Sequence, residues 1–144
     1  MPSSSRRLSI DTEGFSNVIK RLNDLEANVP KVVEKALKDT HAYVTPNIHA
    51  AMKKHNKTGK TERSIADNPR VEWVGSVASI DIGFDISNGG LPSIFLMYGT
   101  KVHGTPRTLK DQILFNSIYG SAVSKKAYEI QQDAFYAEIR RLNG

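Results

Sequence analysis

The chain of 144 residues contains no cysteine, and this absence excludes several kinds of site at once. A disulfide framework, a thiolate metal centre and a cysteine nucleophile all require that residue. A chain of this length buries roughly two-thirds of the surface that it exposes when unfolded, so it can fold on an apolar core without cross-links. We therefore expect one soluble domain, made in a reducing compartment.

Long apolar runs are also missing from the sequence. No stretch approaches the roughly 18 apolar residues of a membrane-spanning helix. Arg6 and Arg7 lie near the start, but the apolar region of a secretory signal does not follow them. We expect neither secretion nor a membrane partner.

Positive charge is in modest excess, with 20 lysines and arginines against 15 acidic residues. Much of that excess lies in residues 53–63, where Glu62 is the single acid. The five basic residues of this segment are Lys53, Lys54, Lys57, Lys60 and Arg63. No aromatic residue that could stack on a base occurs between positions 44 and 72, so contact with nucleic acid would reach phosphate without reading sequence. The segment is thus a candidate DNA- or partner-facing surface, and the alternative is a solvated loop.

Apolar residues at intervals of three and four predict helices near 14–28, 30–55 and 121–142. Pro46 falls inside the second of these, where it removes a backbone hydrogen bond, so we expect a kink there or a break just before it. A shorter helical pattern ends at Gly120.

From Arg70 the apolar residues alternate, which predicts a β-hairpin over 70–84 with Trp73 in or beside the core. Residues 1–12 are expected to be a flexible N-terminal segment, or to contribute a short edge strand through their apolar pair. Residues 13–144 should form a single α+β domain, in which an antiparallel sheet with a central β-hairpin packs against two long helices and a C-terminal helix. The Gly-rich and polar segments 85–92 and 99–108 are expected to be loops that order on assembly.

Catalytic motifs were sought and not found. Gly59-Lys60-Thr61 resembles the end of a phosphate-binding P-loop, but Lys54 stands where that motif requires glycine. The four histidines show no i, i+4 pair for a shared metal, and no Gly-x-Ser-x-Gly sequence frames a nucleophile. We expect no catalytic residue, no cofactor and no metal, and hence a protein that is not an enzyme.

Two short motifs carry a resemblance to a known family. One contains Thr58, Gly59, Ser64 and Ile65 and follows a long helix. The other is Tyr98-Gly99-Thr100, which follows the predicted sheet. In this order and spacing, over residues 12–142, the chain resembles the small tail-component and neck protein family of long-tailed phages and prophages.

The resemblance implies a structural role at the head–tail interface, as a tail completion, tail terminator or neck adaptor protein. It implies a homo-oligomeric ring around the DNA channel, most simply a hexamer, in contact with connector or stopper and tail-tube proteins and with packaged DNA. Its location would be the virion, after assembly in the bacterial host cytoplasm. The alternative function is a sequence-nonspecific nucleic-acid-binding module that uses residues 53–63.

Overall fold

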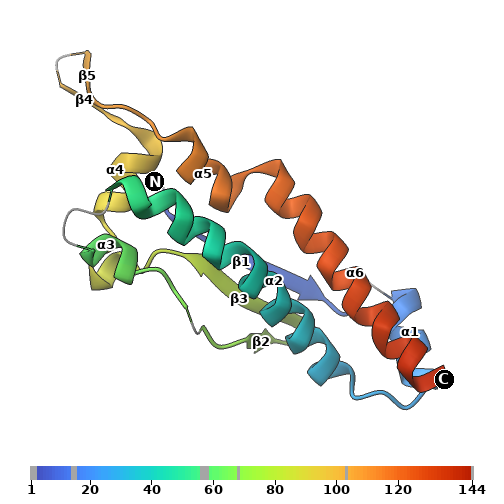
Figure 1. Cartoon of the computed structure of the whole chain (residues 1–144). Helices are drawn as coiled ribbons and strands as arrows, with labels where there is room; N and C mark the ends of the chain where they lie inside the picture. The colour runs from blue at the N-terminus through green and yellow to red at the C-terminus, as the bar shows by residue number, and fades with distance from the viewer. Residues whose placement is uncertain (1–2, 14–15, 56–58, 68, 103, 144) are drawn as a thin grey trace.

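The computed structural model describes residues 3–13, 16–55, 59–67, 69–102 and 104–143. The fold is α+β, as predicted (Figure 1). Its elements in chain order, with η for 3₁₀ turns, are β1 (Ser5–Asp11), α1 (Ser16–Asp24), α2 (Val29–Met52), η1 (Lys53–His55), α3 (Lys60–Arg63), β2 (Glu72–Val74), β3 (Val77–Gly83), η2 (Ile86–Asn88), α4 (Pro92–Tyr98), β4 (Thr100–Val102), β5 (Thr105–Thr108), α5 (Gln112–Tyr119) and α6 (Ser121–Asn143).

A three-stranded antiparallel sheet, in the order β1-β3-β2, forms one layer of the protein. Side chains alternate between its faces, because successive residues of a strand point to opposite sides. The face turned toward α2 is apolar and includes Ile10, Ile80 and Ile82, all buried. The other face is polar, with Arg7 bonded to Asp81 on the neighbouring strand. The single apolar face explains why helices cover only one side of the sheet.

Residues 5–11 of the segment expected to be flexible form β1, so the structure has the edge strand instead. Seven residues of β1 pair with β3 in an antiparallel register that places Leu8 opposite Ile80. Leu8 and Ile10 are both buried. Burial of this apolar pair supplies the free energy that holds the N-terminal segment on the sheet.

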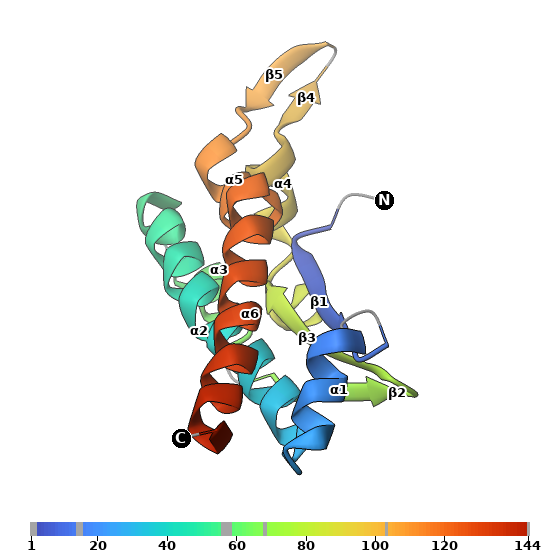
Figure 2. The same cartoon turned by 90° about the vertical axis from the view of Figure 1, so that its right-hand side faces the viewer.

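Helix α2 packs against both β3 and α6 and supplies much of the core (Figures 1 and 2). The side chain of Asn28 caps its first turn by accepting a hydrogen bond from the Lys31 amide. The helix continues through Pro46, so the expected break is wrong. Pro46 lies on the exposed side, while residues before and after it, such as Val44 and Ile48, are buried. Packing on both sides of the proline outweighs one missing backbone hydrogen bond.

The hairpin predicted over 70–84 is confirmed as β2 and β3, joined by a two-residue turn in which Gly75 has a φ of +58°. Trp73 faces the α2 side but remains 36% exposed, because β2 is a short edge strand. Its indole Nε1 donates a 2.9 Å hydrogen bond to Glu34 of α2. Trp73 therefore lies beside the core and not within it.

Three further details differ from the sequence-based prediction. Helix α1 covers only Ser16–Asp24 of the range 14–28, in which residues 14 and 15 lie outside the described part of the chain. Within 85–92, η2 forms a turn capped by Asp85. Within 99–108, β4 and β5 pair as a hairpin that projects beyond the body of the molecule (Figure 2).

Candidate functional site

The predicted basic segment lies at the end of the molecule from which the β4–β5 hairpin projects (Figure 1). Lys53 and Lys54 are exposed in η1, and Lys60 and Arg63 are exposed in α3. Lys57 lies outside the described residues. The structure therefore places four of the five predicted site residues at one end.

Glycine is required at position 89, beneath one of these lysines. Gly89 has a φ of +101°, and a Cβ added there would lie 3.1 Å from Lys60 Cε. The aliphatic stem of Lys60 thus packs over the turn that leads into α4. This contact connects the basic segment to the α4 side of the molecule.

Asp111 joins the basic segment to the base of the projecting hairpin. Its Oδ2 lies 2.6 Å from His55 Nε2 and 3.2 Å from Lys54 Nζ, while its Oδ1 accepts from the Leu114 amide and caps α5. The Asp111 amide also donates to the Leu96 carbonyl at 2.8 Å. The nearly buried carboxylate of Asp111 therefore connects η1 to α5, and its backbone amide adds a bond to α4.

The pKa of Asp111 reflects these contacts. Burial, the largest single influence, raises the pKa because it disfavours the charged carboxylate. The hydrogen bonds from His55, the Leu114 amide and Lys54 together outweigh burial and hold the pKa below its ordinary value. Asp111 is thus a fixed negative charge that neutralises part of the basic surface.

His49 attaches α3 and the segment after it to α2. Its Nδ1 lies 3.1 Å from Glu62 Oε1 and its Nε2 lies 2.8 Å from Asp67 Oδ1. Carboxylates only accept hydrogen bonds, so donation to both requires a protonated imidazolium ring. Partial burial lowers the pKa of His49, but the bonds to Asp67 and Glu62 together raise it above its ordinary value.

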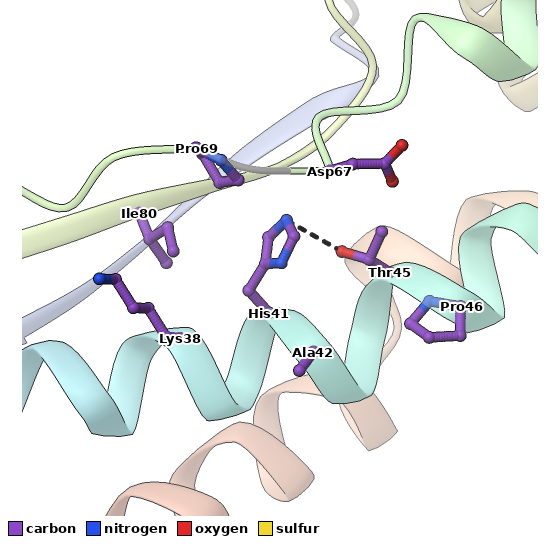
Figure 3. Close-up of a pocket in the computed structure, with 8 residues that line it drawn as sticks. All are labelled: Lys38, His41, Ala42, Thr45, Pro46, Asp67, Pro69 and Ile80. Atoms are coloured by element: carbon purple, nitrogen blue, oxygen red, sulfur yellow. Dashed lines mark hydrogen bonds between the residues drawn. The ribbon is translucent and has the colours of Figure 1, made fainter.

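A cleft of about 570 Å³ lies between α2 and the segment before β2 (Figure 3). Three of its polar side chains are already engaged: His41 Nε2 lies 2.7 Å from the Ala66 carbonyl oxygen and 3.1 Å from Thr45 Oγ1, and Asp67 binds His49. Lys38 is the remaining charged side chain of the described lining, and the one acid of that lining, Asp67, is bonded to His49. We assign it a structural role.

Two segments of the sequence hold much of its excess of basic residues. Residues 53–63 and 100–111 together contain eight lysines and arginines against two acidic residues, and Asp111 of the second segment contacts Lys54 and His55. The rest of the chain contains twelve against thirteen. The described basic side chains of these segments, Lys53, Lys54, Lys60, Arg63 and Lys110, are exposed, and exposed basic side chains attract anionic partners.

The carboxylate partners of the histidines were not predicted from the sequence. Asp111 is 56 positions from His55, and Glu62 and Asp67 are 13 and 18 positions from His49. Asp111 directly before a helical pattern is a recognisable N-cap signal, so its capping role could have been predicted. Its contact with His55 depends on tertiary folding and has no local signal.

No group of three or more histidines, aspartates and glutamates in the described ranges is arranged to hold a metal ion. Among the helices of that same part of the chain, none combines the length and hydropathy needed to cross a membrane. Comparison of the chain with protein-family models, with curated proteins and with solved structures finds no match in any of the three.

Proposed function

We propose that this protein is a structural component of the head–tail interface of a long-tailed phage, of the neck, tail completion or tail terminator kind. Copies would form a ring around the DNA channel, most simply of six, located between connector or stopper and tail-tube proteins. The proposal assigns it no catalysis, no cofactor and no membrane contact. Its location is the virion, after assembly in the host cytoplasm.

The observation that carries this proposal is the exposure of four basic side chains, Lys53, Lys54, Lys60 and Arg63, at the end with the projecting hairpin. DNA inside a channel presents phosphates to the ring around it, and lysines and arginines can contact those phosphates without reading bases. A backbone hairpin that leaves the body offers additional surface to a neighbouring subunit or ring. A joining protein needs both features.

Several residues of the two motifs behind the family resemblance lie at turns or contacts between elements. Thr58 lies outside the described residues. Gly59 begins α3 with a φ of +75°, and Ile65 is buried and bridges to Phe84. Gly99 has a φ of +77° where α4 turns into β4, and the Tyr98 hydroxyl donates to the Ser3 carbonyl at 2.9 Å.

Charge reversal tests the proposal. We expect Lys53→Glu with Lys57→Glu to slow the joining of heads to tails several-fold and to change its salt dependence, since rim charges act mainly on association rate. The control is Lys20→Glu with Arg140→Glu, which changes the net charge equally but lies at the other end, near α1 and the C-terminus. Equal joining rates for the two double variants would contradict a role for the basic end.

A second candidate function, a sequence-nonspecific nucleic-acid-binding module, is favoured by the same charge distribution. It predicts that the free monomer binds any duplex. The logarithm of the binding constant should fall linearly with the logarithm of the salt concentration, with a slope proportional to the number of phosphates contacted. A gel-shift titration at several salt concentrations separates the two functions. Tight duplex binding by monomers, without a defect in particle assembly when the gene is deleted, would favour the binding module.

A further inference from the structure

The turn between β3 and α4 contains an asparagine followed directly by a glycine, Asn88-Gly89. In such a pair the backbone nitrogen of the glycine can attack the side-chain amide of the asparagine, because glycine has no Cβ to hinder the approach. Asn88 is exposed at the end of η2, so water reaches it. The pair is therefore a candidate site of spontaneous chemical modification.

The reaction of this pair consumes only water. The Gly89 nitrogen forms a bond to Asn88 Cγ and the Cγ–Nδ2 bond breaks, so that Nδ2 leaves as ammonia with the proton that the Gly89 amide gives up. The product is a five-membered cyclic imide. Water then opens either of its two carbonyls, which gives aspartate at position 88 or isoaspartate, in which the backbone runs through the former side chain. Both products replace a neutral amide with a carboxylate, which is charged at neutral pH.

Asp85 holds Asn88 in place in the folded turn. Its Oδ2 accepts a 2.6 Å hydrogen bond from Asn88 Nδ2, and its carbonyl oxygen accepts from the Gly90 amide at 3.0 Å. Its Oδ1 accepts from the amide and the hydroxyl of Ser87. The bonds from Ser87 and Asn88 lower the pKa of Asp85, so it is a carboxylate at neutral pH and only accepts hydrogen bonds.

Ring closure requires this turn to open. The imide is planar, so Asn88 Cβ and the Gly89 nitrogen must eclipse each other across the Cα–C bond. A residue of a 3₁₀ turn has a ψ of about −20 to −30°, which leaves the two atoms far from this alignment. Rotation of ψ would move Gly90 away from the Asp85 carbonyl, and the side chain would have to leave Asp85 Oδ2. Both bonds to Asp85 therefore oppose the reaction.

Conversion of Asn88 would keep the turn open. A carboxylate at position 88 places an oxygen where Nδ2 now donates, 2.6 Å from Asp85 Oδ2, and two carboxylates at that separation repel each other. The same turn supports α3, because the Lys60 stem packs over Gly89 and the Asp85 amide donates to the Ser64 carbonyl at 2.7 Å. An open turn thus removes contacts that hold α3 in place.

We propose that Asn88 is a latent self-modification site, which Asp85 keeps as an amide in the folded turn and whose conversion to a carboxylate releases α3 from that turn. The change runs in one direction, because the ammonia diffuses away. It gives α3, which carries Lys60 and Arg63, a slow switch from a packed to a loosened state. The inference is independent of the proposed function, since it depends only on the chemistry and contacts of this turn.

Peptide mapping by mass spectrometry measures the conversion in the full chain during incubation at neutral pH. A second Asn-Gly pair, Asn143-Gly144, provides an internal reference in the same sample. We expect the rate at Asn88, relative to that at Asn143, to rise several-fold in Asp85→Ala. Ser87→Ala is the matched control, because it removes only the hydroxyl bond to Asp85 and should leave the relative rate near that of the parent.

Two further measurements separate loss of this restraint from loss of the fold. Circular dichroism shows whether Asp85→Ala is folded, and the parent unfolded in urea gives the rate without any restraint. Asp85→Asn keeps an oxygen that can accept from Asn88, so its rate should lie between those of the parent and Asp85→Ala. Conversion at the parental rate in folded Asp85→Ala would overturn the proposed restraint.

The effect on α3 is tested with Asn88→Asp, which supplies the charge of the product directly. We expect backbone amides in residues 59–65 and 85–92 to exchange hydrogen several-fold faster in this variant than in the parent. Asn88→Ala loses the hydrogen bond without adding charge, so its exchange should be intermediate, and added salt should narrow the difference between the two variants. Parental exchange in residues 59–65 of Asn88→Asp would overturn the release of α3.

Discussion

Replacement of Asp111 tests whether one carboxylate holds the basic end together. Asp111→Ala removes the α5 N-cap, which costs about 1 kcal/mol. It also removes the 2.6 Å contact with His55, a hydrogen bond to a nearly buried charge that contributes about 1.5–3 kcal/mol. The half-exposed Lys54 pair adds about 0.5 kcal/mol at most. The expected loss is about 2.5–4.5 kcal/mol, or a Tm lower by roughly 10 °C.

Equilibrium urea unfolding at pH 7 measures this loss. Asp111→Asn keeps an N-cap acceptor and should lose only about 1–2 kcal/mol, and Asp133→Ala, an exposed aspartate of α6, should change little. A double-mutant cycle with His55→Ala should give a coupling free energy above about 1 kcal/mol.

The pH dependence gives an independent check. Because the folded-state pKa of Asp111 is lowered, its stabilisation is complete above the unfolded pKa, near 4, and is lost as the pH falls through the folded pKa. The difference between the parent and Asp111→Asn should therefore shrink as the pH falls below the unfolded pKa of Asp111. If Asp111→Ala unfolds within about 0.5 kcal/mol of the parent, the reasoning about this contact is refuted.

Two other substitutions have defined outcomes. His49→Gln should destabilise the protein most near pH 6, because the stabilisation by His49 depends on its charged imidazolium. The loss of stability should become smaller as the pH rises through the raised folded-state pKa of His49. A difference in urea midpoint between parent and variant that grows with pH would contradict this. Trp73→Ala should lower the free energy of unfolding by about 1–2 kcal/mol, since the side chain is one-third exposed. Trp73→Phe should lower it by less, because this change removes mainly the hydrogen bond to Glu34. A loss above about 3 kcal/mol on chemical unfolding of Trp73→Ala would place the indole in the core.

Periodicity predicted the fold wherever a long segment has one apolar face. The stripe of α2 and the alternation of β3 each repeat over at least seven residues, and both elements appear where they were expected. Residues 94–98 are all apolar and show no period, so their pattern does not separate strand from helix; they lie in α4, with Met97 buried and Gly99 at the C-cap. It also missed β4 and β5, which are too short for a period to register.

The candidate site was predictable only as a local charge excess. Residues 53–63 stood out because five basic side chains are close in sequence. The contact of Asp111 with His55 holds this segment near the hairpin, and the contact of His49 with Glu62 attaches it to α2. Both contacts join positions that are distant in the sequence. Such contacts depend on the packing of α2 against α5 and the loops, which no local pattern encodes.

Imaging of intact particles by electron cryomicroscopy tests the central claim most directly, with mass spectrometry of the same particles to confirm that the chain is present. The proposed function predicts a closed ring of this protein, of six copies, at the head–tail junction or the end of the tail, with the end that carries residues 53–63 and the β4–β5 hairpin turned toward DNA or an adjoining ring. Particles that contain the chain at another position, or in no closed ring, would contradict it.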